Sequence, residues 1–169
     1  MGLNTPINMN LDNVLVTMNI EDTPANANLD DTLERLRKEK KYVDDVATRE
    51  IAFLKEYNWL RNDKEKAKYI NELVKKGEYF SAYKAYTSKI YTGHVGNKER
   101  IVMWADKLVE KLFDDGVPGL IPIYTTIMYM IGGLKREEII RRLEPKLEKR
   151  GIDSAKRKVL IEWHPVYRK

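Results

Sequence analysis

The sequence predicts an all-α protein, a helical bundle whose first helix is long and is preceded by an extended N-terminal arm. Apolar residues recur every three to four positions from about residue 29 to residue 163, which is the period of an amphipathic helix. Gly and Pro interrupt this pattern at short intervals, which indicates short loops between antiparallel neighbours. Residues 1–28 instead alternate apolar and polar side chains, which is the period of an extended strand.

The predicted arm, residues 1–28, contains two alternating runs. The first spans Ile7 to Leu11 and the second spans Val14 to Ile20. Asp12-Asn13 between them would turn the two runs into a β-hairpin. A lone two-stranded hairpin is marginally stable in water, so we expect the arm to pack on the helical body or on another chain.

Residues 29–169 form one predicted helical domain, which begins with a long helix at 29–60. At 1.5 Å per residue this helix would be about 45 Å long, and Asp30 or Asp31 can cap its start. Charged residues interrupt its apolar stripe at Arg35–Tyr42. We therefore expect this part of the helix to project from the domain or to cross something charged.

Residues 61–169 form a predicted compact bundle. Its expected helices are 63–76, 78–91, 97–116, 122–131, 135–150 and 153–163, the last capped by Asp153. Gly77, Gly116 and Gly151 are the expected stops, and Pro145 is expected to bend or split its helix. Pro122–Ile131 is apolar almost all round. It therefore reads as a buried helix at the centre of the bundle, not as a membrane span, since Pro and Gly residues flank it.

The composition excludes some classes of protein. The chain of 169 residues has no Cys, which excludes a disulfide framework and thiol chemistry. It also has no Gln, and Glu and Lys are abundant, a composition typical of heat-adapted proteins. No Lys or Arg precedes Arg35, so we expect no secretory signal peptide.

Residues suited to catalysis or metal binding do not cluster along the chain. His94 and His164 have no nearby His or Cys, whereas metal sites need several converging ligands. The doublets Asp44-Asp45, Asp114-Asp115 and Glu137-Glu138 favour structural roles because adjacent helical side chains diverge. We therefore expect no metal, no cofactor and no enzymatic activity, although an enzyme without a local motif stays open as an alternative.

The net charge of +5 is unevenly distributed. Residues 61–100 carry +5 and residues 135–169 carry +6, whereas residues 101–134 between them carry −2. Basic blocks of this size favour contact with a polyanion such as nucleic acid; the alternative is a set of solvated helix faces. The candidate nucleic-acid-binding residues are Arg37, Lys38, Lys40, Lys41, Lys84, Lys89, Lys98, Arg100, Arg141, Arg142, Lys149 and Lys156.

Two further segments lie within the first basic block. Gly93–Lys98 lacks the spacing of a P-loop and favours a helix–helix turn, although amides at the start of the next helix can bind an anion. Tyr79, Phe80, Tyr83, Tyr86 and Tyr91 are interleaved with lysines. Such rings can stack on bases, but a Tyr-rich core helix is the favoured interpretation.

The order of these parts resembles the helical coat proteins of filamentous archaeal DNA viruses. Those proteins combine an extended N-terminal segment and DNA-wrapping helices with a compact helical C-terminal part. The matching segments here are Met1–Asn28, Asp30–Leu60 and Asp63–Lys169. The resemblance implies non-specific DNA packaging in a helical virion and self-association through the N-terminal arm. The expected location is then the virion, or the cytoplasm for a cellular protein.

The leading hypothesis is therefore a non-enzymatic, self-assembling protein that binds nucleic acid without sequence specificity, with DNA as the expected partner. The alternative is a small helical accessory or regulatory DNA-binding protein of replication or transcription. In that case Gly132–Gly151 could hold a helix-turn-helix segment. The choice among duplex DNA, single-stranded DNA and RNA stays open.

Overall fold

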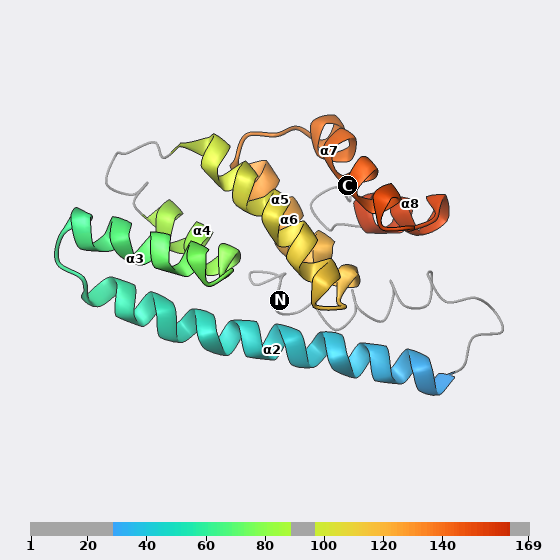
Figure 1. Ribbon diagram of the computed structural model, residues 1–169, viewed down its shortest axis with the longest axis horizontal. Coiled ribbons are helices and arrows are strands. Elements are labelled where there is room, and N and C mark those ends of the chain that lie inside the picture. The colour runs from blue at the N-terminus through green and yellow to red at the C-terminus, as the bar shows by residue number, and fades with distance from the viewer. Residues whose placement is uncertain (1–28, 89–96, 163–169) are drawn as a thin grey trace, which may run out of the picture.

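The computed structural model describes residues 29–88 and 97–162, and this part of the chain is an all-α bundle without strands. The predicted fold class is thus confirmed, while the predicted arm, residues 1–28, lies outside the described residues. The helices are α2 (Leu29–Trp59), α3 (Asp63–Lys75), α4 (Tyr79–Ser88), α5 (Lys98–Asp114), the short 3₁₀ helix η3 (Pro118–Leu120), α6 (Ile121–Ile131), α7 (Arg136–Lys149) and α8 (Ser154–Glu162) (Figure 1).

The helix ends follow the capping residues of the sequence. The Asp153 carboxylate accepts a hydrogen bond from the Lys156 backbone N–H at 2.9 Å, which confirms the predicted cap of α8. Gly77, Gly116 and Gly151 have φ values of 78°, 75° and 79°. Glycine adopts this left-handed conformation without steric cost, so these three residues end α3, α5 and α7 as predicted.

The core is centred on α5 and α6. α6 buries most of its residues, including Tyr124, Met128 and Tyr129, as predicted for the apolar helix. The end of α6 lies against the start of α5, because a Cβ atom placed on Gly132 would lie 2.5 Å from Val102 Cγ2. The absence of a side chain at Gly132 therefore sets how closely these two helices approach.

α7 corrects two expectations about the C-terminal region. It buries Ile139, Leu143 and Leu147 and continues through Pro145 as one helix, so of the predicted bend or split, the split does not occur. Pro145 and Arg141 are both exposed, and water can satisfy the Arg141 carbonyl that Pro145 leaves without a donor. A helix-turn-helix needs two helices, whereas Gly132–Gly151 contains only α7.

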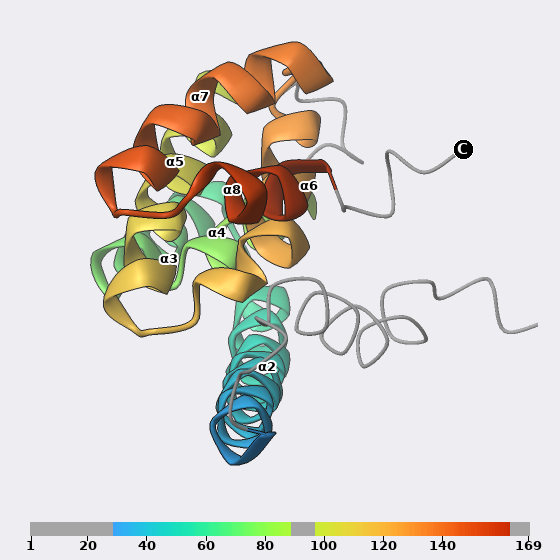
Figure 2. The same cartoon turned by 90° about the vertical axis from the view of Figure 1, so that its right-hand side faces the viewer.

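α2 runs along one side of the bundle, with α4 packed against it (Figures 1 and 2). Its buried residues are Glu39, Val43, Val46 and Tyr57, so residues 29–38 contribute none. Tyr42 Oη donates a hydrogen bond to Asp115 at 2.7 Å, and the Glu39 carboxylate lies directly against Gly119. Polar contacts to the α5–α6 connection therefore hold the middle of α2, and its first turns extend beyond them.

Candidate anion-binding surface

An open groove with a volume of about 710 Å³ lies where α3, α4, α5 and α7 meet. It is lined mainly by charged side chains, with Gly77 and Tyr79 at one edge. The charged residues are Lys75, Lys76, Asp106, Lys107, Glu110, Lys111, Asp114, Asp115 and Lys146. Five lysines and four carboxylates therefore share this surface, and its chemistry depends on which of them already have partners.

Two arginines of the α7 region form ion pairs with three of the groove carboxylates. Asp106 accepts two close hydrogen bonds from Arg142, from Nη2 at 2.6 Å and from Nε at 2.8 Å. Arg150 contacts Glu110 at 2.6 Å and Asp114 at 3.0 Å. The hydrogen bond with Asp106 raises the pKa of Arg142 above its ordinary value. α5 thus supplies the acids that pair with two arginines of the basic C-terminal block.

The fourth carboxylate and two of the lysines are also engaged. Asp115 accepts the hydrogen bond from Tyr42 and lies 3.4 Å from Lys111 Nζ, and Lys75 pairs with Glu72 at 3.2 Å. Within the described residues, Lys76, Lys107 and Lys146 form no ion pair. The groove therefore presents three ammonium groups that form no ion pair, and its five lysines with the two arginines outnumber its four carboxylates, an arrangement that attracts anions.

Several of the residues predicted to bind nucleic acid are engaged in the fold. Arg142 pairs with Asp106, Lys84 pairs with Glu50, and Lys41 pairs with Asp45 at 3.0 Å. Arg100 lies over the Tyr86 ring at 5.8 Å. The ammonium groups of Lys38 and Lys98 lie beside Gly116 and Gly133, and Lys156 also has a partner.

The remaining predicted residues do not form one surface. Lys89 lies outside the described residues. Arg37 and Lys40 are exposed on α2, whereas Arg141 and Lys149 are exposed on α7, and these helices lie on opposite sides of the molecule (Figures 1 and 2). A single flat polyanion contact cannot include both pairs.

None of the five groove lysines was among the predicted residues. Lys107 and Lys111 lie in the segment with net charge −2, so a search for basic blocks passes over them. The Lys75-Lys76 doublet before Gly77 offered a local signal, because cations favour helix C-termini. Only the packing of the bundle brings the five together in one groove.

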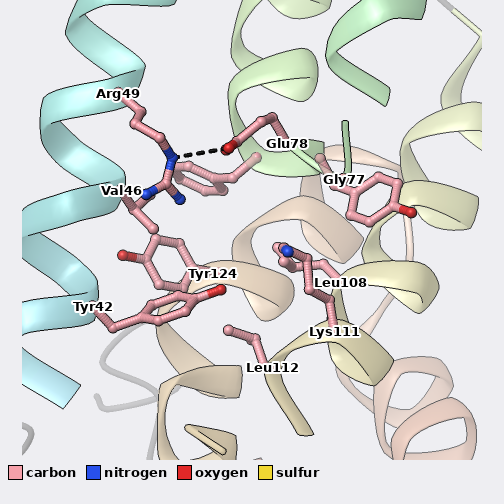
Figure 3. A pocket seen from close by; sticks show the side chains of 11 residues that line it. Tyr42, Val46, Arg49, Gly77, Glu78, Leu108, Lys111, Leu112 and Tyr124 are labelled. Carbon is pink, nitrogen blue, oxygen red and sulfur yellow. Dashed lines mark hydrogen bonds and ion pairs between the residues drawn. The ribbon is translucent and has the colours of Figure 1, made fainter. Parts of the chain in front are cut away.

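A second, smaller pocket lies between α2, α4, α5 and α6 (Figure 3). Its volume of about 20 Å³ accommodates about one water molecule. Arg49 Nε donates to Glu78 at 2.8 Å across its edge. Burial raises the pKa of Tyr124, and burial together with the hydrogen bond to Asp115 raises that of Tyr42. Both phenols therefore stay protonated at neutral pH.

The described part of the aromatic run serves the core, as the favoured interpretation predicted; Tyr91 lies outside it. Phe80 packs edge-to-face on Tyr124, with ring centroids 4.9 Å apart. Tyr86 packs in the same manner on Trp104 at 5.5 Å, and Tyr83 is buried. These rings therefore pack against other side chains of the core, so their faces are not exposed for stacking on bases.

The described residues contain no group of three or more His, Cys, Asp or Glu side chains arranged to hold a metal ion; His94 and His164 lie outside them. None of the helices in 29–88 and 97–162 has both the length and the apolar character needed to cross a bilayer. No protein-family model, curated protein or solved structure matches this chain.

Proposed function

We propose that the protein is non-enzymatic, binds nucleic acid without sequence specificity and assembles with copies of itself. The observation that carries the binding part is the groove, where Lys76, Lys107 and Lys146 have no acidic partner among the described residues. Lysine ammonium groups are point charges on long stems, which suits contact with a phosphate backbone and gives no base readout.

The assembly part of the proposal rests on the sequence pattern of residues 1–28. An arm with one apolar face needs a surface to cover it, and a second chain can provide that surface through strand pairing or exchange. Together with the resemblance to helical coat proteins of filamentous archaeal DNA viruses, this pattern supports a role in DNA packaging within a virion. A thermophilic source belongs to the same proposal.

The groove predicts a specific salt dependence. We would replace Lys76, Lys107 and Lys146 by Ala and measure binding to labelled duplex DNA by anisotropy over a salt series. Because each phosphate contact releases about one counterion, the slope of log K against log salt should fall by about 3 in magnitude. Single-stranded DNA and RNA titrated in parallel establish which nucleic acid binds most tightly.

A charge-matched control is available on α2 and α3. Lys55, Lys64 and Lys68 are also exposed but do not line the groove, so replacing all three by Ala removes the same net charge. An equal loss of affinity in both triple variants would contradict a localised site. No binding by the unmodified protein at low salt would remove nucleic acid altogether.

Light scattering on the same samples separates packaging from the accessory or regulatory alternative. Growth into large particles with DNA supports packaging, whereas binding without growth supports an accessory protein. Deleting residues 1–28 should abolish that growth and leave helicity unchanged by circular dichroism. A truncated protein that still assembles would contradict the role proposed for the arm.

A further inference from the structure

α2 exposes an unusual share of the large apolar side chains. Seven large hydrophobic residues are exposed among the described residues, and four of them lie on α2: Leu29, Leu33, Ile51 and Trp59. Ile51 is 71% exposed, and its neighbours in sequence are Glu50 and Ala52. The four residues lie toward the two ends of α2, two at each end, so a partner that contacts both pairs must run along the helix.

Two of these residues belong to a single stripe that also carries two charges. Leu33, Lys40, Asp44 and Ile51 are separated by seven, four and seven positions, spacings that return to the same side of a helix with 3.6 residues per turn. All four are exposed. At 100° per residue the stripe lies about a third of a turn around α2 from the buried residues Glu39, Val43 and Val46, and it extends over about 27 Å at 1.5 Å per residue.

The two charged groups of the stripe have no partner within the described residues. The neighbouring Lys41 and Asp45 pair with each other at 3.0 Å, but Lys40 and Asp44 form no ion pair with a described side chain. A Lys placed four residues before an acid is the less favourable order within one helix. Both charges therefore remain available for contacts with another molecule.

The stripe has an apolar residue at each end and two charged residues between them, and reversing its direction only exchanges the positions of the base and the acid. It runs apolar, basic, acidic, apolar, and Leu33 and Ile51 are placed symmetrically about position 42, as are Lys40 and Asp44. A two-fold axis at that position would set Leu33 against the partner's Ile51 and Lys40 against the partner's Asp44. By symmetry each contact then occurs twice, as in any isologous interface.

We propose that a second copy of this chain packs antiparallel along α2 through this stripe. The charge complementarity selects the antiparallel copy, since a parallel copy in register would set Lys40 beside Lys40. This surface is distinct from the N-terminal arm and from the groove. It requires no nucleic acid, so the inference can fail independently of the function proposed above.

A charge-exchange experiment tests the pairing. The K40D variant would place two acids opposite each other at both symmetric positions, and the D44K variant would do the same with two bases. We expect each variant alone to dimerise about tenfold more weakly than the unmodified full-length chain, measured by sedimentation velocity over a concentration series. An equimolar mixture should restore association, because the acid introduced at position 40 of one variant then faces the base introduced at position 44 of the other.

Two further variants complete the test. K149D reverses an exposed charge on α7 and should dimerise normally, whereas L33S/I51S should weaken association without changing helicity. A mixture of K40D and D44K that associates no better than either alone would overturn the proposal. Unchanged association of L33S/I51S would also overturn it and would point to residues 1–28 as the cover of this face.

Discussion

α5 and α2 differ in how the bundle holds them. α5 has 17 residues and buries seven of them, including Trp104 and Leu112. α2 has 31 residues and buries only four, one of which is Glu39. Burial of apolar area stabilises α5. α2 places fewer apolar residues in the core, Val43, Val46 and Tyr57, and is also held by polar contacts such as the Tyr42–Asp115 hydrogen bond and the Arg49–Glu78 ion pair. Helix length therefore does not measure how strongly a helix belongs to the core.

This difference has a functional consequence. A helix that buries few residues in the core leaves other faces exposed for contact with another molecule. On α2 the stripe from Leu33 to Ile51 is exposed in this way. α5 is enclosed on most sides, so its remaining charged edge pairs with α7 and forms the wall of the groove. The two proposed contacts, with a second copy and with a polyanion, thus lie on elements held in different ways.

The largest expected effect is a difference in the free energy of unfolding lost when a residue of α5 or of α2 is truncated. Leu112 on α5 is 0% exposed, so Leu112→Ala should lower the free energy of unfolding by about 2–5 kcal/mol through lost burial and a residual cavity. Ile51→Ala on α2 should change it by no more than about 0.5 kcal/mol. Urea denaturation at low protein concentration measures both. Equal losses would mean that α2 contributes to the core as much as α5 does.

A smaller effect is expected where α5 meets α6 and α7. Asp106 accepts a hydrogen bond from the buried Tyr129 hydroxyl at 2.6 Å and pairs with Arg142. Asp106→Ala should cost about 1–3 kcal/mol, chiefly because Tyr129 loses its acceptor. The half-exposed Arg142 regains water, so its ion pair contributes little.

Asp106→Asn is the matched variant for this site. Its carbonyl can still accept from Tyr129 but cannot form the ion pair with Arg142, so it should lose less than about 1 kcal/mol. If the Asn variant were as unstable as the Ala variant, the ion pair and not the buried hydroxyl would be the stabilising contact.

The last expected effect is absent at neutral pH and is a dependence of stability on alkaline pH. Burial raises the pKa of Tyr124 above its ordinary value of 10.0, and burial with the Asp106 hydrogen bond does the same for Tyr129. The folded state thus retains these protons when the unfolded chain releases them. Their contribution is complete below pH 10 and is lost as the pH rises above it, by about 1.4 kcal/mol per pH unit for each phenol.

Tyr124→Phe isolates that contribution, because Tyr124 packs on Phe80 through its ring. Urea denaturation of both proteins between about pH 8 and about pH 11 should give a shallower decline for the variant. Lysine titration affects both proteins alike, so the difference between them reports the single phenol. Parallel declines would mean that Tyr124 ionises in the folded state as readily as in the unfolded chain.

The positions of the helices followed from the sequence because helix periods, caps and stops are local properties. Asp153, Gly77 and Gly151 act where the pattern placed them, and the apolar run at Pro122–Ile131 became the central helix. Each of these properties depends on neighbours within about one or two turns. The sequence predicted that the charged stretch Arg35–Tyr42 of α2 would project or cross something charged. Within that stretch Glu39 is buried and Tyr42 is hydrogen-bonded to Asp115, so it does not project as a whole.

The partners of the charged residues were decided only by the tertiary structure. Arg142 meets Asp106 across 36 residues, and Arg150 meets Glu110 across 40. The sequence could count these charges, but electrostatic pairing depends on distances that packing alone sets. For that reason the sequence placed the candidate site on basic blocks. Lys76 and Lys146 belong to those blocks, but only packing brings them to one groove with Lys107, which lies between the blocks in sequence.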